Sequence, residues 1–450
     1  MIGKEKLLKK LEGILAKSTA DETEIVFAGT SSGLTRFANS HIHQNVYENN
    51  AKILFRSAIG KKVGVASTNS LVTNDLVKTL KDSIEIARQQ PENPDWPGLP
   101  GPAKYKKLNT FDETTAAFTP KDRARGVKKI IAEARRKKFT VAGAFSTSSG
   151  EIAVINSNGV RAYQPVTSSS VNMIPMSDTS SGYAAGMSRR VADLDLVGMA
   201  KIAVEKCDRS QNPIQVEPGE YEVILEPSAI AEMMEWLSYV GLGSKPFLEN
   251  MSFLSGKIGR KITSEKITMF DDGLDERTVA FPFDFEGVPK QKVVFINKGI
   301  AKGVVYDRAA AKKARKKSTG HAVTADEASH GAFPLNVSIA PGRASRAGMV
   351  AKVKRGILIT RFHYINGLID PRNSVLTGMT RDGTFLIEDG EIKHGIKNLR
   401  FTDNIMRAFK SVQAISREVE YKDSWWGDVG CMTVPTMHLG SFKFTGKTDF

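Results

Sequence analysis

The sequence predicts an α+β protein of two domains, with helix-plus-sheet layers in residues 1–213 and a β-rich, antiparallel and barrel-like domain in residues 214–450. Three observations favour this class. A chain of 450 residues exceeds the usual size of one domain. Its first part alternates helical with strand-like periodicity, whereas its second part consists mostly of short strand-like runs between glycine turns. Loop-like segments mark a connector at 91–105 and a boundary at 210–220.

The first domain opens with an amphipathic helix, since the apolar residues of KEKLLKKLEGIL recur at helical spacing. A later helix has a clear start, because Thr119 is a good N-cap and Pro120 suits the first helical position. The expected strands and hairpins are 24–29, 33–49 as either two strands or one long kinked strand, the hairpin 51–68 turned at Gly60, and the two runs joined by Asn158-Gly159. The expected helices after the first are 70–89, 119–138 and 194–207.

The second domain contains one prominent helix, predicted at 227–241, among strand-like runs such as KITMFDDG and GILITRFHYING. The stretch AIAEMMEWLSYVG within this helix places Glu235 among apolar residues. Burial of a carboxylate without a partner is costly. Glu235 therefore either faces solvent or lies where the protein uses a buried carboxylate.

Composition indicates a soluble globular protein, because 41% of the residues are hydrophobic and 25% are charged. Cys207 and Cys431 are too few for a disulfide framework, so we expect a reduced, intracellular environment. Charges interrupt the apolar runs near the N-terminus, which argues against a signal peptide, and no apolar run reaches the roughly 18 residues of a membrane span. We therefore expect a cytoplasmic protein without a membrane partner.

The net charge of +15 and a pI of about 9.5 raise the question of a nucleic-acid partner. Two clusters stand out in the sequence. Arg135–Lys138 ends a predicted helix, where basic residues complement the helix dipole, and this interpretation is favoured. Lys312–Lys317 either attracts the carboxylates of a peptide or is a solvated loop, and no aromatic residues accompany it as in a nucleic-acid patch. Nucleic acid is therefore not the expected partner.

Motifs for common cofactors and metals are absent. The sequence has no H-E-x-x-H, C-x-x-C, P-loop, G-x-S-x-G or G-x-G-x-x-G pattern. His41 and His43 would face the same side of a strand, but no carboxylate or cysteine lies near them in sequence, so surface hydrogen bonding is favoured over metal binding. We expect a function without a cofactor.

Four segments together resemble the TldD/PmbA family, first described as modulators of DNA gyrase and then as peptidases. These segments are TRFANSHIHQN (35–45), KIGRKITSEKITMFDDG (257–273), YDRAAAKKARKKSTGHA (306–322) and RFHYINGLIDPRNSVLTGMTRDGTFLIEDGEIKHGIKNLRFTDN (361–404). The resemblance implies a two-domain α+β fold and a dimer. It also implies two types of member: TldD-type metallopeptidases for unfolded or small peptides, with H-E-x-x-x-H on a helix and a C-terminal cysteine ligand, and TldE/PmbA-type partners without these ligands.

The resemblance places the helix at 227–241 where family members of the TldD type carry H-E-x-x-x-H. In this register Met234 and Tyr239 replace the two histidines, and Glu235 keeps the glutamate. Zinc is held by Cys, His, Asp or Glu, so Cys431 alone would not hold it. The resemblance therefore implies no metal, Glu235 as the remnant of a general base, and candidate substrate-binding residues at Tyr239, Ser318, Thr319, Gly320 and Arg381.

These implications make a metal-free, TldE/PmbA-like subunit of a TldD/TldE-type peptidase system the expected function. Its expected partners are a TldD-like metallopeptidase subunit or a second copy of itself, and a peptide substrate. An exposed sheet edge would hold an extended peptide by strand addition. Two alternatives stay open: an active metallopeptidase or amide hydrolase that binds zinc, and a nucleic-acid-associated gyrase modulator.

Overall fold

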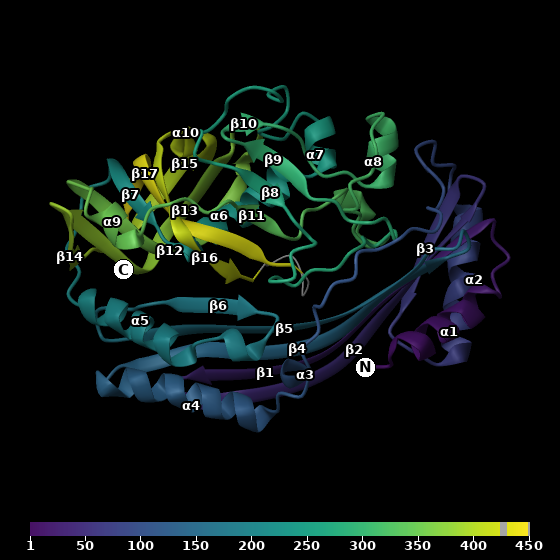
Figure 1. Cartoon of the computed structure of the whole chain (residues 1–450), viewed down its shortest axis with the longest axis horizontal. Coiled ribbons are helices and arrows are strands. Elements are labelled where there is room, and N and C mark those ends of the chain that lie inside the picture. The colour runs from purple at the N-terminus through teal and green to yellow at the C-terminus, as the bar shows by residue number, and fades with distance from the viewer. Residues whose placement is uncertain (424–429, 449–450) are drawn as a thin grey trace.

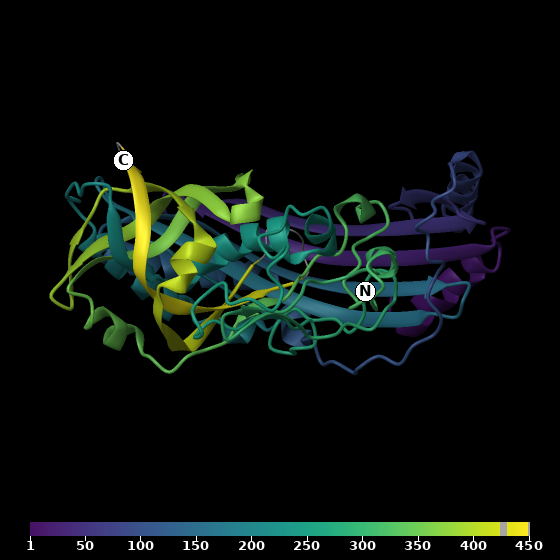
Figure 2. The ribbon, with the colours of Figure 1, turned by 90° about the horizontal axis from the view of Figure 1, so that it is seen from above.

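The computed structural model describes residues 1–423 and 430–448, which form two domains (Figure 1). The N-terminal domain is built on a six-stranded sheet in the order β3-β2-β1-β4-β5-β6, and all its pairings are antiparallel. The sheet is long and extends past the C-terminal domain at one end (Figures 1 and 2). Its strands are β1 (Glu22–Ala38), β2 (His41–Ile59), β3 (Lys62–Thr68), β4 (Thr140–Asn156), β5 (Arg161–Met176) and β6 (Ala184–Ser188).

Two pairs of helices cover one face of this sheet, one pair at each end (Figure 1). The helix predicted from Thr119 is confirmed, because Thr119 and Asp122 form a reciprocal capping box and Pro120 lies in the first turn. The helices of this domain are α1 (Lys4–Leu15), α2 (Thr73–Gln89), α3 (Glu113–Ala116), α4 (Pro120–Arg136) and α5 (Leu196–Arg209), with the 3-10 turn η1 (Val191–Asp193).

The first hairpin confirms the two-strand alternative for residues 33–49, although its first strand also includes the run predicted separately at 24–29. The next two hairpins agree with the prediction. A single strand covers the separately predicted runs from 24 to 38, and the chain turns at Asn39 and Ser40, which have φ of 50° and 59°. Positive φ at both turn positions matches the twist of a two-residue hairpin, and this turn contains no Gly to signal it. The hairpins predicted at Gly60 and at Asn158-Gly159 are confirmed by the register of their strands.

The C-terminal domain holds an eleven-stranded sheet, part of which closes on itself. Strand β17 pairs with both β15 and β7, so β7, β12, β13, β15 and β17 form a ring. The predicted α+β class is confirmed, although β7 with β12 and β11 with β17 are parallel pairs in this mostly antiparallel domain. The strands are β7 (Glu220–Leu225), β8 (Met269–Asp271), β9 (Val293–Asn297), β10 (Ile300–Ala301), β11 (Val337–Ile339), β12 (Arg355–Asp370), β13 (Val375–Glu388), β14 (Glu391–Gly395), β15 (Leu399–Asn404), β16 (Val412–Lys422) and β17 (Met432–Lys447).

The helix predicted at 227–241 is shorter than expected and ends in a different kind of turn. α6 covers Pro227–Leu237, and a π turn, η2, continues over Ser238–Leu242. A Cβ at Gly241 would lie 2.2 Å from the Phe253 ring. The backbone of the turn therefore packs so closely against this ring that position 241 has no room for a side chain. The other helices and turns are α7 (Ser244–Leu248), α8 (Arg308–Lys313), η3 (Ala328–His330), α9 (Arg346–Val350), η4 (Pro371–Asn373) and α10 (Ile405–Lys410).

The second face of the N-terminal sheet packs against the C-terminal domain. Phe281 and Phe283 lie in an apolar cluster with residues of β1, β2, β4 and β5. Buried polar contacts cross the same boundary, and Arg56 of β2 pairs with Glu286 at 3.3 Å. The predicted connector at 91–105 has no regular secondary structure, and among the described residues no helix is long and apolar enough to cross a membrane.

Candidate functional site

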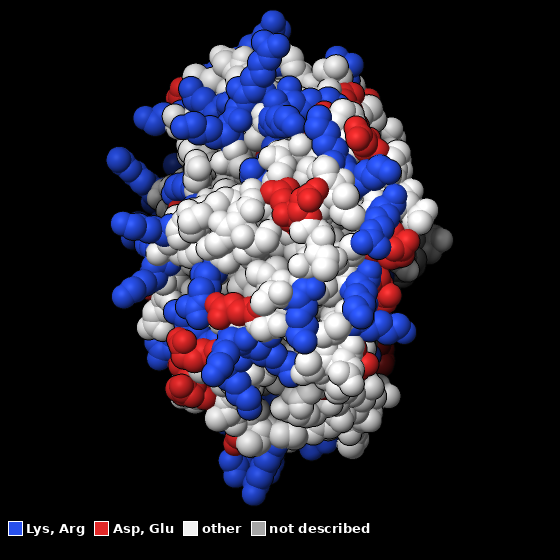
Figure 3. Space-filling model, turned by 90° about the vertical axis from the view of Figure 1, so that its right-hand side faces the viewer, with Lys and Arg blue, Asp and Glu red and all other residues white. Residues whose placement is uncertain are grey.

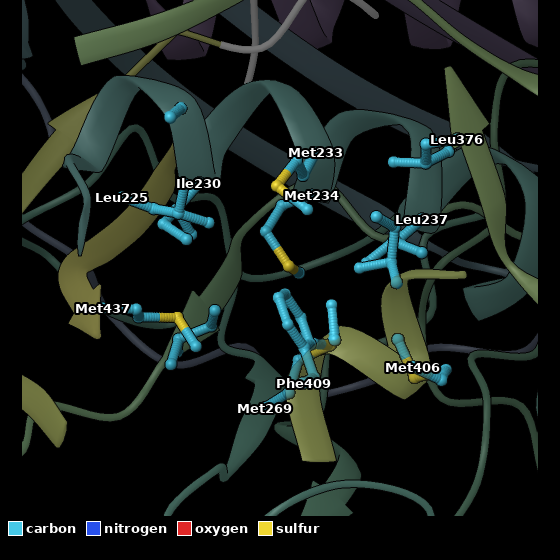
Figure 4. Packing of buried hydrophobic residues seen from close by; sticks show 14 of the residues in the cluster. Leu225, Ile230, Met233, Met234, Leu237, Met269, Leu376, Met406, Phe409 and Met437 are labelled. Carbon is cyan, nitrogen blue, oxygen red and sulfur yellow. The ribbon is translucent and has the colours of Figure 1, made fainter. Parts of the chain in front are cut away.

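Helix α6 buries Glu235 inside the C-terminal domain. Glu235 is 1% exposed, which excludes the solvent-facing alternative that the sequence left open. Met234, its neighbour, is fully buried in the main apolar cluster, and its thioether points toward Phe409 and Met269 (Figure 4). The residue that the family resemblance aligns with the first histidine of the TldD-type helix therefore belongs to the hydrophobic core.

Tyr239 lies in the π turn, beyond the end of α6. Its ring contacts the Trp236 ring edge to face, with centroids 6.1 Å apart and planes at 85°. Unlike Met234, Tyr239 lines a cavity between the two domains. The two positions thus belong to different surroundings, one to the core and one to the cavity. π turns are rare and occur often at functional sites.

The interdomain cavity has a volume of about 440 Å³ and lies between the second face of the N-terminal sheet and loops of the C-terminal domain. Its sheet side is rich in hydroxyl groups and small residues, and Ser148 bonds Ser168 across β4 and β5 at 2.7 Å. Its other side is largely apolar. The residues that give these two sides their character include Thr30, Ser148, Gly150, Thr167 and Ser168 from the sheet and Val279, Phe285, Val323, Phe333 and Leu335 from the C-terminal domain.

A segment between 322 and 333 covers part of this cavity and is fixed at two points. Lys52 of β2 pairs with Asp326 at 2.5 Å, and Lys245 donates a hydrogen bond to the Ser329 carbonyl at 2.5 Å. Glu327 and His330 of the same segment line the cavity. The cavity is therefore bounded by residues from both domains and carries a few charged groups at its margin.

Ser318, Thr319 and Gly320 form a tight turn next to this covering segment. The Thr319 hydroxyl accepts a hydrogen bond from the Tyr306 amide at 2.8 Å, and the Ser318 hydroxyl donates to the Tyr306 carbonyl at 3.1 Å. Gly320 has φ of 72° and packs against the backbone at Pro289. Of the five residues predicted to bind substrate, Tyr239 alone is among the described residues that line the cavity.

A buried polar pair that sequence reasoning missed lies directly beyond this turn. His321 Nε2 is 3.0 Å from Asp271 Oδ1, and both side chains are fully buried. Burial disfavours the charged carboxylate, but His321, Lys290 and the Asn336 amide together outweigh burial and hold the pKa of Asp271 below its usual value. The other ring nitrogen, Nδ1, lies 2.9 Å from the Thr319 carbonyl. Both imidazole nitrogens are thus engaged, so His321 fixes the position of the turn.

Arg381 lies away from the cavity, in a separate hollow of about 430 Å³ that residues 178–181 and 210 help to line. Its Nε is 3.9 Å from Asp382. Asp382 is held mainly by Arg361, whose Nε donates to it at 2.7 Å, and it also accepts a hydrogen bond from the Ser181 hydroxyl. The structure therefore does not bring Arg381 together with Tyr239.

Glu232 is a second α6 carboxylate that sequence reasoning did not single out. It accepts a hydrogen bond from the Phe362 amide at 2.6 Å and lies 3.6 Å from Arg361. Burial raises the pKa of Glu232 to about 8, although Arg361 acts in the opposite direction. Its signal in the sequence is its place one turn before Glu235, on the same apolar helix.

The residues of this site do not fit a zinc ion. Neither a buried thioether at Met234 nor a tyrosine at 239 belongs to the usual zinc donor set of Cys, His, Asp and Glu. Cys431 lies in a small apolar cluster with Val166 and Val279, where burial raises the pKa of its thiol. In the part of the chain that the structure describes, no three His, Cys, Asp or Glu side chains are placed to hold a metal.

Two family models match the chain over most of its length. The PmbA/TldA metallopeptidase central domain matches residues 106–210, and the PmbA/TldA metallopeptidase C-terminal domain matches residues 218–446. A protein of Methanocaldococcus jannaschii without an assigned function is 26% identical, over 78% of this chain and 80% of its own. Metalloprotease PmbA of Escherichia coli is 23% identical, over 84% and 82% of the two chains.

Solved structures share this fold. TldE from Thermococcus kodakarensis superposes with a TM-score of 0.89 at 24% identity, covering 97% of this chain and all of that one. A Thermotoga maritima protein described as a candidate modulator of a DNA gyrase gives a TM-score of 0.88 at 17% identity, covering 98% and 100% of the two chains. At these identities the similarity establishes the fold.

Proposed function

The chain belongs to the PmbA/TldD family, and from this premise we propose that it is a metal-free, TldE/PmbA-like subunit of a two-component peptidase. It pairs with a TldD-like metallopeptidase subunit, which supplies the catalytic metal site. Together the two subunits act on unfolded or small peptides.

The side chain of Met234 carries this proposal. In the register that the family resemblance implies, it replaces a histidine of TldD-type members, and it is fully buried against apolar side chains (Figure 4). To coordinate zinc from this position, the side chain would have to be an imidazole that reaches the metal. Here Glu235 lies on a helix whose neighbouring residue belongs to the core, so it has no metal-bound water to deprotonate.

The interdomain cavity supports a role in holding peptide. Its mixture of hydroxyl groups and apolar side chains suits an extended backbone with apolar side chains, and about 440 Å³ is the size of a small-ligand pocket. Tyr239 and the segment at 322–333 line this cavity from the C-terminal domain, and sheet residues such as Ser148 and Ser168 line it from the N-terminal domain. The chain therefore contributes a wall of the peptide chamber in the complex.

Elemental analysis tests the metal-free state. The chain purified alone, after expression with supplemental zinc, should hold far less than one zinc ion per chain. About one zinc per chain, lost on Cys431→Ser, would support the alternative of an active metallopeptidase. Light scattering of the chain mixed with a TldD-like subunit should show a heterodimer, and two separate monomers would count against the pairing.

A further inference from the structure

Helix α4 carries a large part of the positive charge of the whole molecule. Between Pro120 and Lys138 the sequence has nine Lys and Arg residues and two Asp and Glu residues, a net charge of +7 out of +15 for the chain. Arg123 is buried and bonds the Thr35 and Thr147 hydroxyls, so the other eight basic residues account for the exposed charge. The helix dipole favours basic residues only in the last turn, so it does not explain positive charge along the whole helix.

The exposed basic residues of α4 form a stripe along the helix. Lys121, Arg125, Lys128 and Arg135 follow one another at intervals of four, three and seven residues, which places them on one side of a helix. The opposite side, with Val127 and Ile130, is buried against the sheet. At about 1.5 Å per residue, the 14 steps from Lys121 to Arg135 extend the stripe over roughly 21 Å.

Most of this charge is not neutralised within the molecule. Asp122 pairs with Arg125 at 3.0 Å, Glu133 pairs with Arg136 at 2.8 Å, and Asp208 pairs with Lys137 at 2.9 Å. Among the described residues, four lysines of the stripe and its end have no ion-pair partner. They are Lys121, Lys128, Lys129 and Lys138.

A hollow of about 620 Å³ lies alongside the stripe. The turn between β1 and β2 forms one wall through Ser40, His41 and Ile42, and α4 forms the other. The Arg135 guanidinium reaches across and donates to the Ser40 carbonyl at 3.4 Å. Basic side chains thus line a concave surface, which is a suitable shape for a chain of anionic groups.

We propose that this face of α4 binds the phosphate backbone of duplex nucleic acid. A stripe of roughly 21 Å spans about six phosphates of one strand, at 3.4 Å per phosphate along the duplex axis. No Phe, Tyr or Trp lines the hollow among the described residues, and His41 is a single ring, so a stacking platform for the bases of a single strand is not favoured. A membrane surface is not favoured either, because the apolar side of α4 is buried in the core and cannot insert into lipid.

This binding is independent of the proposed peptidase role. α4 covers one face of the N-terminal sheet, whereas the interdomain cavity lies on the other face. Figure 1 shows the helix on the side of the sheet away from the C-terminal domain. A duplex on α4 therefore leaves the cavity open, and failure of either proposal leaves the other intact.

Fluorescence anisotropy with a labelled 20-base-pair DNA duplex, over a series of salt concentrations, tests the proposal. Contacts from the four unpaired lysines alone predict a slope of log K against log salt of about −3.6. Replacement of Lys121, Lys128, Lys129 and Lys138 by Ala should remove most of this slope. Because none of the four has an ion-pair partner among the described residues, a thermal melt should show an intact fold.

A matched control removes the same charge elsewhere. Lys4, Lys6, Lys9 and Lys17 are exposed on or beside α1, at the other end of the sheet (Figure 1). Figure 3 shows that Asp and Glu lie among the Lys and Arg residues at this end of the molecule. Their replacement by Ala should leave the salt slope nearly unchanged. An equal loss in both variants would show attraction by net charge alone and overturn the proposal. Tighter binding of polyglutamate than of duplex to the same face would also overturn it, because the partner would then be an acidic peptide.

Discussion

Two glutamates on α6, one turn apart, have different surroundings. Glu235 is almost completely buried, beside a methionine of the core. Glu232 lies at the domain boundary, where it accepts a backbone hydrogen bond and faces Arg361. Burial raises the pKa of Glu232 to about 8, whereas an unfolded chain would titrate near 4.5. This difference links the stability of the fold to pH.

Glu232 should lower the stability of the protein as pH rises from about 5 to 8. Below the unfolded pKa both states bind the proton, so there is no contribution. Above it the unfolded state releases the proton while the folded state keeps it until about pH 8, so unfolding becomes easier. Denaturant titrations at several pH values should therefore show a smaller loss of stability for Glu232→Gln than for wild type. The same pH dependence in both proteins would contradict this assignment.

At the scale of an element, the π turn after α6 is the feature that separates the environments of positions 234 and 239. Gly241 packs its backbone against the Phe253 ring. Gly241→Ala should destabilise the protein by about 1–3 kcal/mol through overpacking, as measured by chemical denaturation. Phe253→Leu in the same chain should recover part of this loss by making room.

A second glycine provides the matched control for this substitution. Gly13 lies inside α1, and a Cβ there would meet no atom within 4 Å. Gly13→Ala should stabilise the protein by about 0.5–1 kcal/mol, since Ala loses less conformational freedom in a helix. A loss at Gly13 as large as at Gly241 would show that the effect of Gly241→Ala does not come from the contact with Phe253.

Local signals in the sequence predicted most elements of the N-terminal domain. Thr119 and Pro120 fixed the start of α4, and the Asn158-Gly159 pair fixed a hairpin. The turn at Asn39-Ser40 contains no Gly, so the sequence left open whether residues 33–49 form two strands or one kinked strand. The π turn was missed because it depends on a tertiary contact with Phe253. Local hydrophobic periodicity does not predict such contacts between segments that are distant in the sequence.

The site was less predictable than the fold for the same reason. The sequence indicated Tyr239, which lines the interdomain cavity. Arg381 lies in another hollow, and the Ser318–Gly320 turn makes hydrogen bonds to Tyr306. The partners that decide these roles, such as Asp271 for His321, lie far away along the chain and meet only in the folded protein. A sequence motif alone does not predict these hydrogen-bond partners.

At the scale of the whole molecule, a buried ion cluster joins the domains. Arg56 bonds Glu24 at 2.9 Å within the sheet and Glu286 at 3.3 Å across the boundary. Arg56→Met should destabilise the protein by about 3–5 kcal/mol, because it leaves two buried carboxylates without their cation. Chemical denaturation at neutral pH measures this loss.

An exposed pair across the same boundary is the control for Arg56. Lys52 and Asp326 are 46% and 35% exposed, so Lys52→Met should change stability by no more than about 1 kcal/mol. The Arg56→Met deficit should also shrink at acid pH. Burial already raises the pKa of Glu24 to about 7 despite Arg56, so protonation readily removes its charge. Equal losses in the two variants would contradict the importance of the buried cluster.

The most direct test of the metal-free role is the hydrolysis of an unfolded peptide by the complex with a TldD-like subunit. Glu235→Gln in this chain should leave the rate within a few-fold of wild type, whereas Glu→Gln in the H-E-x-x-x-H helix of the TldD-like subunit should lower it by about 10²–10⁴-fold. A thermal melt confirms that each variant is folded. If this chain alone hydrolyses the peptide, and Glu235→Gln abolishes that activity, α6 is a working catalytic helix and the central claim is wrong.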